Sequence, residues 1–437
     1  MRGSIFAALL LSTPIFAAPT NDAASSSSTT PDPSTTGGVT SDAPNSPAWD
    51  ESFQGTPQPI DGDLGASVLG PHNLPLELEA PDFVLPPTTD HGSVDNAKWP
   101  FALSHNRIQT GGWARQQNNG IMPIASALAG VNMRLKAGAV RELHWHSTAE
   151  WAYVLKGTTR ITAVNADGQN YIADVNAGDV WYFPPGIPHS LQGLNDSSVD
   201  GTEFLLVFDS GSFSEDATFL LTDWLAHVPK EILAKNFNVN ISAFDHIPAN
   251  ELYIFPSAVP PPISQNAVAD PSGTVPHPFS FALSQVNATK LPGGSVKILD
   301  STTFNVSQTI AAAEVTVEVG GMRELHWHPT EPEWSYFLEG QGRVTLFAAQ
   351  SNARTFDYQA GDIGYVPPSF GHYVENTGNT TLKYLEIFAS DRYQDISLNQ
   401  WLALTPPDLV KAHLGFDDDT INALDKTKQT VVGAPSS

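Results

Sequence analysis

Short segments in which apolar and polar residues alternate recur through most of the chain. They are rich in Val, Ile, Tyr, Phe and Trp, and Gly, Pro, Asn and Asp interrupt them. The clearest examples lie at 153–155, 160–164, 171–175, 180–183 and 204–208. This alternation predicts half-buried β-strands, and many strands at close spacing favour an all-β fold built as a β-sandwich or jelly-roll barrel.

Two other segments show the three-to-four-residue spacing of apolar side chains that is typical of helices. They lie at 224–237 and 401–414, after the predicted strands. We interpret each as a small helical appendage at the C-terminal end of a barrel.

Several sequence blocks occur twice. RELHWH stands at 141–146 and again at 323–328, and AGDVWYFPP at 177–185 returns as AGDIGYVPP at 360–368. Repeats at such a long and nearly constant offset indicate two homologous domains. We place the N-terminal domain at 53–250 and the C-terminal domain at 263–437, with a Pro-rich linker near 259–263.

The N-terminus is typical of a secreted protein. Residues 1–18 combine Arg2, an apolar run at 5–11 and small residues at 17 and 18, as a signal peptide does. Residues 19–52 form a leader rich in Ser, Thr and Pro, which is too polar to fold. We therefore expect an extracellular protein with glycans on surface loops. The candidate acceptors are Asn195, Asn240, Asn287, Asn305 and Asn379.

Charge and cysteine content exclude several functions. The chain has 437 residues, of which 21 are Lys or Arg and 46 are Asp or Glu, giving a formal net charge of −25. Such a charge argues against nucleic acid or an anionic membrane surface as a partner. An anionic substrate would have to be attracted by local cations. The absence of cysteine excludes disulfides, thiol catalysis and cysteine-ligated metals.

Three histidines and a glutamate in the first repeat form a candidate metal site. His144 and His146 lie two residues apart, so on a strand both imidazoles face the same side. Glu150 keeps the same parity if the strand continues, and His189 follows on a later segment. Three imidazoles and one carboxylate directed at one point predict a metal ion with open positions for substrate.

The second repeat carries the same set as His326, His328, Glu333 and His372. Glu333 comes one residue later than the spacing of the first repeat requires, so a bulge or turn must absorb the extra residue. Glu331 is the rival ligand because its simple parity is right. We prefer Glu333 because the aromatic residues that follow it match those after the first glutamate.

The spacing of these ligands and of the surrounding glycines and prolines resembles the two motifs of the cupin superfamily. Two complete motif sets indicate a bicupin. RELHWH in both halves, the segment 211–219 and the block TDWLA after it resemble secreted fungal oxalate decarboxylases. The resemblance implies two manganese ions per chain, dioxygen as co-catalyst, oxalate as substrate and a homo-oligomeric assembly.

The resemblance also implies roles for single residues. Glu215 corresponds to the lid glutamate that moves a proton, and Arg141 to the arginine that binds substrate beside the metal. Arg323 is the counterpart of that arginine in the second domain. Glu386 corresponds to a second-domain carboxylate sometimes proposed as an acid. Strict strand parity, however, places Arg141 on the opposite face from His144.

The implied reaction splits oxalate into carbon dioxide and formate. Heterolysis would leave a poorly stabilised carbanion, so a redox-active metal is favoured over zinc. The second repeat has no Glu in the loop at 389–400 that corresponds to the lid. We therefore expect turnover at the N-terminal site and a structural or electron-holding role for the other. The alternatives are an oxalate oxidase that makes hydrogen peroxide, and a non-enzymatic bicupin that binds or stores a ligand.

Overall fold

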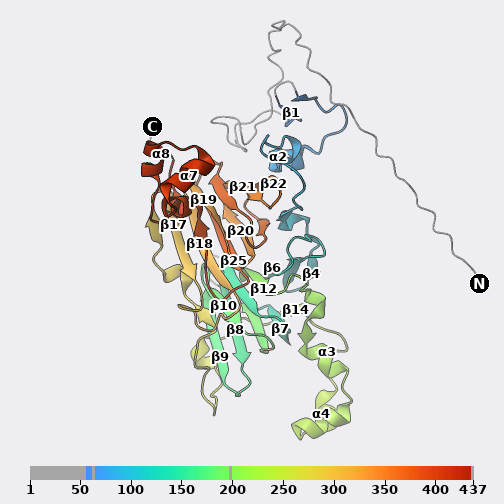
Figure 1. Ribbon diagram of the computed structural model, residues 1–437. Coiled ribbons are helices and arrows are strands. Elements are labelled where there is room, and N and C mark those ends of the chain that lie inside the picture. Colours follow the sequence, from blue (N-terminus) through green and yellow to red (C-terminus); the bar gives the residue numbers. More distant parts are fainter. Residues whose placement is uncertain (1–55, 62–63, 196–198, 435–437) are drawn as a thin grey trace, which may run out of the picture. The chain divides into compact units, whose positions relative to one another are not determined.

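A computed structural model describes residues 56–61, 64–195 and 199–434 (Figure 1). The predicted signal peptide at 1–18 and the leader at 19–52 lie outside the described residues. β-Strands outnumber helices throughout the described chain, and the predicted pair of β-barrels with helical appendages is confirmed. Within the described ranges, no helix is long and apolar enough to cross a bilayer.

The first barrel contains the strands predicted from the alternating pattern. Its strands are β4 (Arg107–Gln109), β5 (Gly112–Gln117), β6 (Ala129–Leu135), β7 (Val140–Trp145), β8 (Glu150–Val164), β9 (Asn170–Asn176), β10 (Val180–Phe183), β11 (His189–Gly193), β12 (Thr202–Phe208) and β13 (Phe219–Leu220). The first half of β8 pairs with β10 and β12, and its second half with β9 and β11. This single strand therefore belongs to both layers of the sandwich.

Gly157 lies where β8 passes from one layer to the other. Its φ is +73°, and a Cβ there would lie 2.0 Å from the carbonyl oxygen of Gly201. Only glycine fits this backbone without strain.

The second barrel repeats the arrangement. Its strands are β16 (Thr289–Leu291), β17 (Gly294–Leu299), β18 (Ala311–Val317), β19 (Met322–Trp327), β20 (Glu333–Glu339), β21 (Gln341–Phe347), β22 (Ala353–Gln359), β23 (Asp362–Val366), β24 (His372–Asn376), β25 (Leu382–Phe388) and β26 (Ile396–Ser397). Here β20 and β21 together correspond to β8.

The two barrels exchange edge segments. The N-terminal elements are β1 (Ile60–Asp61), β2 (Leu64–Gly65), α1 (Leu74–Glu79), α2 (Pro81–Val84), β3 (Lys98–Pro100) and η1 (Phe101–Leu103). Of these, β3 pairs with β23 of the second barrel. Along the chain, α5 (Ile263–Asn266), β15 (Ser280–Phe281) and η4 (Leu283–Gln285) connect the two barrels. Of these, β15 pairs with β10 of the first barrel.

This exchange ties the two domains together. Trp151 and Tyr182 of the first barrel share one apolar cluster with Trp334 and Tyr365 of the second. The indole N–H of Trp334 also donates to Oε1 of Gln117 at 2.7 Å. Domain boundaries predicted from the sequence repeat do not reveal that β3 and β15 each pair with a strand of the other barrel.

Each appendage contains several short helices rather than one continuous helix. They are α3 (Leu221–Ala226) and α4 (Lys230–Phe237) with η3 (Ile241–Phe244), and α6 (Leu398–Ala403) and α7 (Pro407–Leu414) with α8 (Asp418–Ala423). Pro229 and Pro406 are the N-caps of α4 and α7, so a proline separates the helices of each pair. The chain then returns as β14 (Ile254–Phe255) beside β7, and as β27 (Val431–Val432) beside β19.

Candidate metal centres and lid

The first candidate centre gathers three imidazoles and one carboxylate in the interior of the first barrel. His144, His146, Glu150 and His189 are all buried, and one potential ligand atom from each lies within 4.8 Å of the others. Nε2 of His146 and Nε2 of His189 lie 3.2 Å and 3.4 Å from Oε2 of Glu150. The four predicted ligands are therefore brought to one point.

Backbone carbonyl groups orient the three imidazoles. Nδ1 of His144 lies 2.6 Å from the carbonyl oxygen of Glu142, and Nδ1 of His146 lies 2.7 Å from that of Thr148. Nδ1 of His189 likewise lies 2.8 Å from the carbonyl oxygen of Ile187. A neutral imidazole that donates through Nδ1 keeps Nε2 as a free lone pair, which is the tautomer a metal ion requires.

A divalent metal ion fits these residues. Nε2 of His189 is buried without a hydrogen-bond partner among the described residues, a cost that a bound metal would remove. Burial, and then the charge of Arg141, lower the pKa of His144 well below its usual value, so this imidazole stays neutral. Burial would raise the pKa of Glu150, but the neighbouring imidazoles hold it below its usual range.

The second candidate centre repeats the first. His326, His328, Glu333 and His372 are buried, with one potential ligand atom from each within 4.8 Å of the others. Nε2 of His328 lies 3.0 Å from Oε2 of Glu333, and Nε2 of His326 is buried without a hydrogen-bond partner among the described residues. Glu331 is outside this cluster, and its carboxylate accepts from the hydroxyl of Thr330.

The carboxylate ligand comes from a new strand, which corrects the parity argument. Parity places Glu150 on the face of His144 only if one unbroken strand joins them. Instead β7 ends at Trp145, and Glu150 is the first residue of β8. Glu333 is likewise the first residue of β20, so the connecting turn absorbs the extra residue.

A β-bulge resolves the difficulty with Arg141. His189 pairs with His144, but Leu191 pairs with Arg141, so between these pairs two residues of β7 face one residue of β11. The bulge turns the side chains of both Arg141 and His144 inward and leaves Leu143 exposed. β19 and β24 repeat the same shift in register.

The guanidinium of Arg141 makes few hydrogen bonds to the protein. Its Nη1 donates to the carbonyl oxygen of Tyr253 at 3.4 Å, and its guanidinium carbon lies 4.2 Å from the centre of the Tyr253 ring. Leu206 on β12 lines the same small cavity. Burial lowers the pKa of Arg141 to about 10, against the raising effects of the Glu215 and Glu150 carboxylates.

Glu215, the predicted lid glutamate, is buried although it lies in a loop. It begins η2 (Glu215–Ala217), and its backbone N–H donates to Oε1 of Gln116 at 3.0 Å. Its Oε2 has no hydrogen-bond partner among the described residues. Burial raises its pKa to about 7, against the lowering effects of Arg141 and Arg107. Glu215, Arg141 and three of the ligands line one cavity of about 10 Å³.

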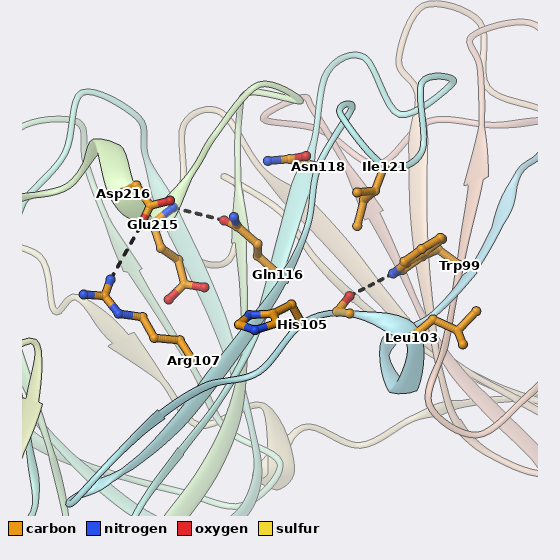
Figure 2. A pocket seen from close by; sticks show the side chains of 10 residues that line it. Trp99, Leu103, His105, Arg107, Gln116, Asn118, Ile121, Glu215 and Asp216 are labelled. Carbon is orange, nitrogen blue, oxygen red and sulfur yellow. Dashed lines mark hydrogen bonds and ion pairs between the residues drawn. The ribbon is translucent and has the colours of Figure 1, made fainter.

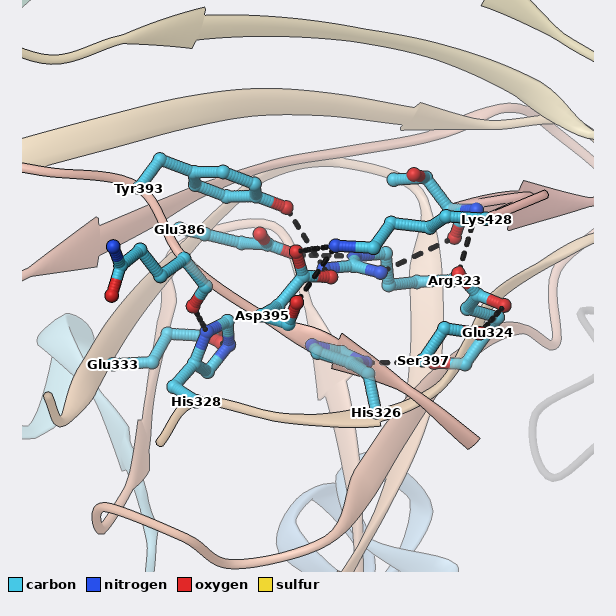
Figure 3. Close-up of polar contacts among 12 residues, drawn as sticks. Arg323, Glu324, His326, His328, Glu333, Glu386, Tyr393, Asp395, Ser397 and Lys428 are labelled. Carbon is cyan, nitrogen blue, oxygen red and sulfur yellow. Dashed lines mark hydrogen bonds and ion pairs between the residues drawn. The ribbon is translucent and has the colours of Figure 1, made fainter. Parts of the chain in front are cut away.

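Arg323, the counterpart of Arg141, is saturated with partners (Figure 3). Its Nε donates to Oε1 of Glu386 at 3.1 Å, and its Nη2 donates to Oη of Tyr393 at 2.8 Å and to Oδ2 of Asp395 at 2.7 Å. Tyr384 also donates to Oε1 of Glu386, whereas Oε2 has no partner among the described residues. Burial raises the pKa of Glu386.

Some of the residues that bind the two arginines were not among those predicted from the sequence. Tyr393 and Asp395 lie in the loop that corresponds to the lid, and both bind Arg323. Their position there was a usable signal, because a polar loop beside a metal site commonly carries site residues. Tyr253, which binds Arg141, gave no such signal, since it lies far from the motifs in sequence.

The five candidate glycan acceptors are exposed, as N-glycosylation requires. They are Asn195, Asn240, Asn287, Asn305 and Asn379.

Comparisons with known proteins agree with this geometry. A model of the cupin family matches residues 104–243 and 280–422. The chain is 52% identical over 376 residues to the oxalate decarboxylase of Bacillus subtilis, covering 86% of this chain and 97% of that protein. It is 43% identical over 383 residues to a probable oxalate decarboxylase of Arthroderma benhamiae, covering 86% and 93%.

Solved structures of the Bacillus subtilis enzyme have the same fold. A mutant of that enzyme matches with a TM-score of 0.85 and 51% identity, covering 87% of this chain and 100% of that one. Another structure, with the same score, identity and coverage, was studied for the Mn(II) centers of that enzyme.

Proposed function

The chain belongs to the oxalate decarboxylases of the cupin superfamily, and we propose that it converts oxalate to formate and carbon dioxide at its N-terminal metal centre. One observation carries this proposal. A guanidinium, Arg141, and a buried carboxylic acid, Glu215, line the same small cavity as the metal ligands. That cavity therefore combines an anion-binding group, a proton carrier and a metal site.

Manganese is the proposed ion at both centres, two per chain. The three imidazoles and one carboxylate of each centre accept it, and the Mn(II) centers of the Bacillus subtilis relative support the choice. When bound, manganese with dioxygen as co-catalyst would supply the one-electron acceptor that the reaction needs.

Arg141 is the proposed substrate-binding residue. The formal net charge of −25 repels a dicarboxylate, so a local cation must compensate. The Arg141 guanidinium has free donors and can bind a carboxylate through two parallel hydrogen bonds. It would hold one end of oxalate while the carbon–carbon bond breaks.

Glu215 is the proposed proton carrier. The net reaction takes monoprotonated oxalate to formate and carbon dioxide, so the proton must leave a carboxyl oxygen and arrive at carbon. A carboxyl group whose pKa is raised to about 7 can take and return a proton under mildly acidic conditions. The burial of Glu215 also keeps water away from the reaction intermediate, because water could otherwise react with it.

The C-terminal centre is proposed to be structural or electron-holding. Its arginine, Arg323, already binds Glu386, Tyr393 and Asp395, so little donor capacity remains for substrate. Glu386 has a raised pKa and one unpartnered oxygen, so it is the candidate acid if this centre does react.

Secretion and self-association are also proposed. The signal-like N-terminus and the exposed sequons support an extracellular glycoprotein. Large apolar side chains are exposed on the appendages of both domains, as expected of surfaces that pack against another copy. They include Trp224, Ile232, Phe237, Trp401, Leu404 and Leu409.

Oxalate oxidase activity is the second candidate, because the metal ligands would be the same. The buried position and raised pKa of Glu215 favour the decarboxylase, since a nearby acid can protonate the carbon before it is oxidised further. A non-enzymatic bicupin is disfavoured because both ligand sets are complete.

The proposal is tested by assaying the protein after chelation and after reloading with manganese. Oxalate consumption, formate, hydrogen peroxide and bound metal are measured in aerated, mildly acidic buffer. We expect one formate per oxalate, little peroxide and two manganese ions per chain. Peroxide as the main product would indicate an oxidase, and no turnover by the loaded protein would contradict catalysis.

A further inference from the structure

A second, larger cavity, which we call the outer cavity, is lined in part by Glu215 and Asp216 of the predicted lid (Figure 2). Its volume is about 570 Å³, enough for a small organic anion and its hydration water. The residues that line it include His105, Arg107, Gln116, Asn118, Glu215 and Asp216.

Glu215 forms a wall of both cavities. It lines the outer cavity together with Arg107, and the inner cavity together with Arg141 and the metal ligands. The inner cavity, about 10 Å³, is near the minimum for a single water molecule and cannot accept oxalate while the lid holds this position. A substrate approaching from the outer cavity must therefore displace Glu215.

Arg107 is the arginine at this outer wall. Its Nη2 pairs with Oε1 of Glu251, whereas its Nη1 lies 3.7 Å from Oδ1 of Asp216, beyond hydrogen-bonding distance. Its guanidinium carbon lies 3.5 Å from the centre of the Tyr253 ring, and that of Arg141 lies 4.2 Å from the same centre. One aromatic ring thus separates an outer arginine from the inner arginine.

We propose that the outer cavity is a collecting site for the dicarboxylate substrate, and that Arg107 binds one carboxylate before the lid opens. The inference rests on the proposed function and deepens it. Arg107 supplies the local cation that a protein of net charge −25 needs in order to attract a dianion. The carboxylates of Asp216 and Glu251, both paired with Arg107, oppose this attraction.

Arg107 is a positioning residue in this account, because Glu215 separates it from the metal centre. It should affect the capture of oxalate more than its conversion. Its Nη1 makes only the long ion pair with Asp216, unlike the guanidinium of Arg323, whose Nε and Nη2 both donate to carboxylates.

The test compares Arg107→Gln, Arg107→Lys and Arg392→Gln in steady-state oxalate turnover at several salt concentrations. Arg392 is the matched control, since it is a half-exposed arginine of the other domain with one carboxylate partner, Asp300, at 3.2 Å. For Arg107→Gln we expect a KM about tenfold higher and a kcat within about twofold of wild type. Its kcat/KM should also depend less on salt, and Arg107→Lys should restore most of the loss.

Asp216→Asn provides a second, opposite test if Arg107→Gln fails to fold. It removes an exposed carboxylate from the same cavity, so KM for oxalate should fall. The inference is overturned if Arg107→Gln matches Arg392→Gln, if kcat falls while KM is unchanged, or if Asp216→Asn leaves KM unchanged. A wild-type protein that turns over no oxalate would instead remove the proposed function, and this inference with it.

Discussion

The different partners of the two arginines lead to a sharp prediction for Leu206. Leu206 on β12 pairs with Ala152 of β8, just as Glu386 on β25 pairs with Ser335 of β20. The two positions are therefore equivalent. In the second domain a carboxylate stands there and binds the arginine, whereas in the first domain an apolar side chain leaves Arg141 available.

Leu206→Glu should convert the first site to the arrangement of the second. The introduced carboxylate can reach the Arg141 guanidinium, as Glu386 reaches Arg323 at 3.1 Å. A hydrogen bond to a charged group contributes about 1.5–3 kcal/mol, and oxalate would lose two of them. At about 1.4 kcal/mol for each tenfold, kcat/KM for oxalate should fall by at least about 100-fold.

Leu206→Gln is the matched control, because glutamine has nearly the same shape as glutamate and no charge. Formate production is measured for both variants, with bound manganese and the thermal unfolding midpoint as checks on the fold. We expect Leu206→Gln to lose about tenfold or less. Equal activity of the two variants at unchanged metal content would refute the idea that a free Arg141 distinguishes the first site.

Two further predictions concern the metal centres and Asp82, a buried carboxylic acid in α2. His144→Ala should remove one of two manganese ions per chain and lower formate production by about 100-fold or more. His326→Ala should remove the other ion and keep most of the turnover. Equal losses of activity in the two variants would contradict the proposed division of roles. Burial, and then the charge of Asp357, raise the pKa of Asp82 to about 8 from an ordinary value of 3.8. The folded state therefore keeps a proton that the unfolded state releases, so stability falls as pH rises from about 4 to 8. Asp82→Asn should unfold at a higher temperature than wild type at pH 8 and at the same temperature near pH 4, and a pH-independent difference would count against this account.

Ligand identity was predictable from the sequence because it depends on residue type and on repetition. All eight predicted ligands lie in two clusters, and the preference for Glu333 over Glu331 agrees with the structure. The matching aromatic residues after each glutamate led to this choice, whereas simple strand parity favoured Glu331. Parity was misleading because it assumes an unbroken strand, and both ligand glutamates begin a new one.

The placement of Arg141 depends on features that a single sequence does not display. A bulge in β7 turns it inward, and its contacts come from Tyr253, more than 100 residues further along the chain. The exchange of β3 and β15 between barrels is equally non-local. Such pairings depend on which edges remain open after the barrels form, and alternation within a strand carries no information about them.

The central claim is that Glu215 returns the proton to carbon at the N-terminal centre. The most direct measurement is the ratio of formate to hydrogen peroxide made from oxalate by wild type and by Glu215→Gln, at equal manganese content. The account predicts nearly stoichiometric formate from wild type. In Glu215→Gln, formate should fall by about 100-fold or more, with peroxide a larger share of what remains. Unchanged formate production by Glu215→Gln would contradict the claim, and the proton would have to come from another group.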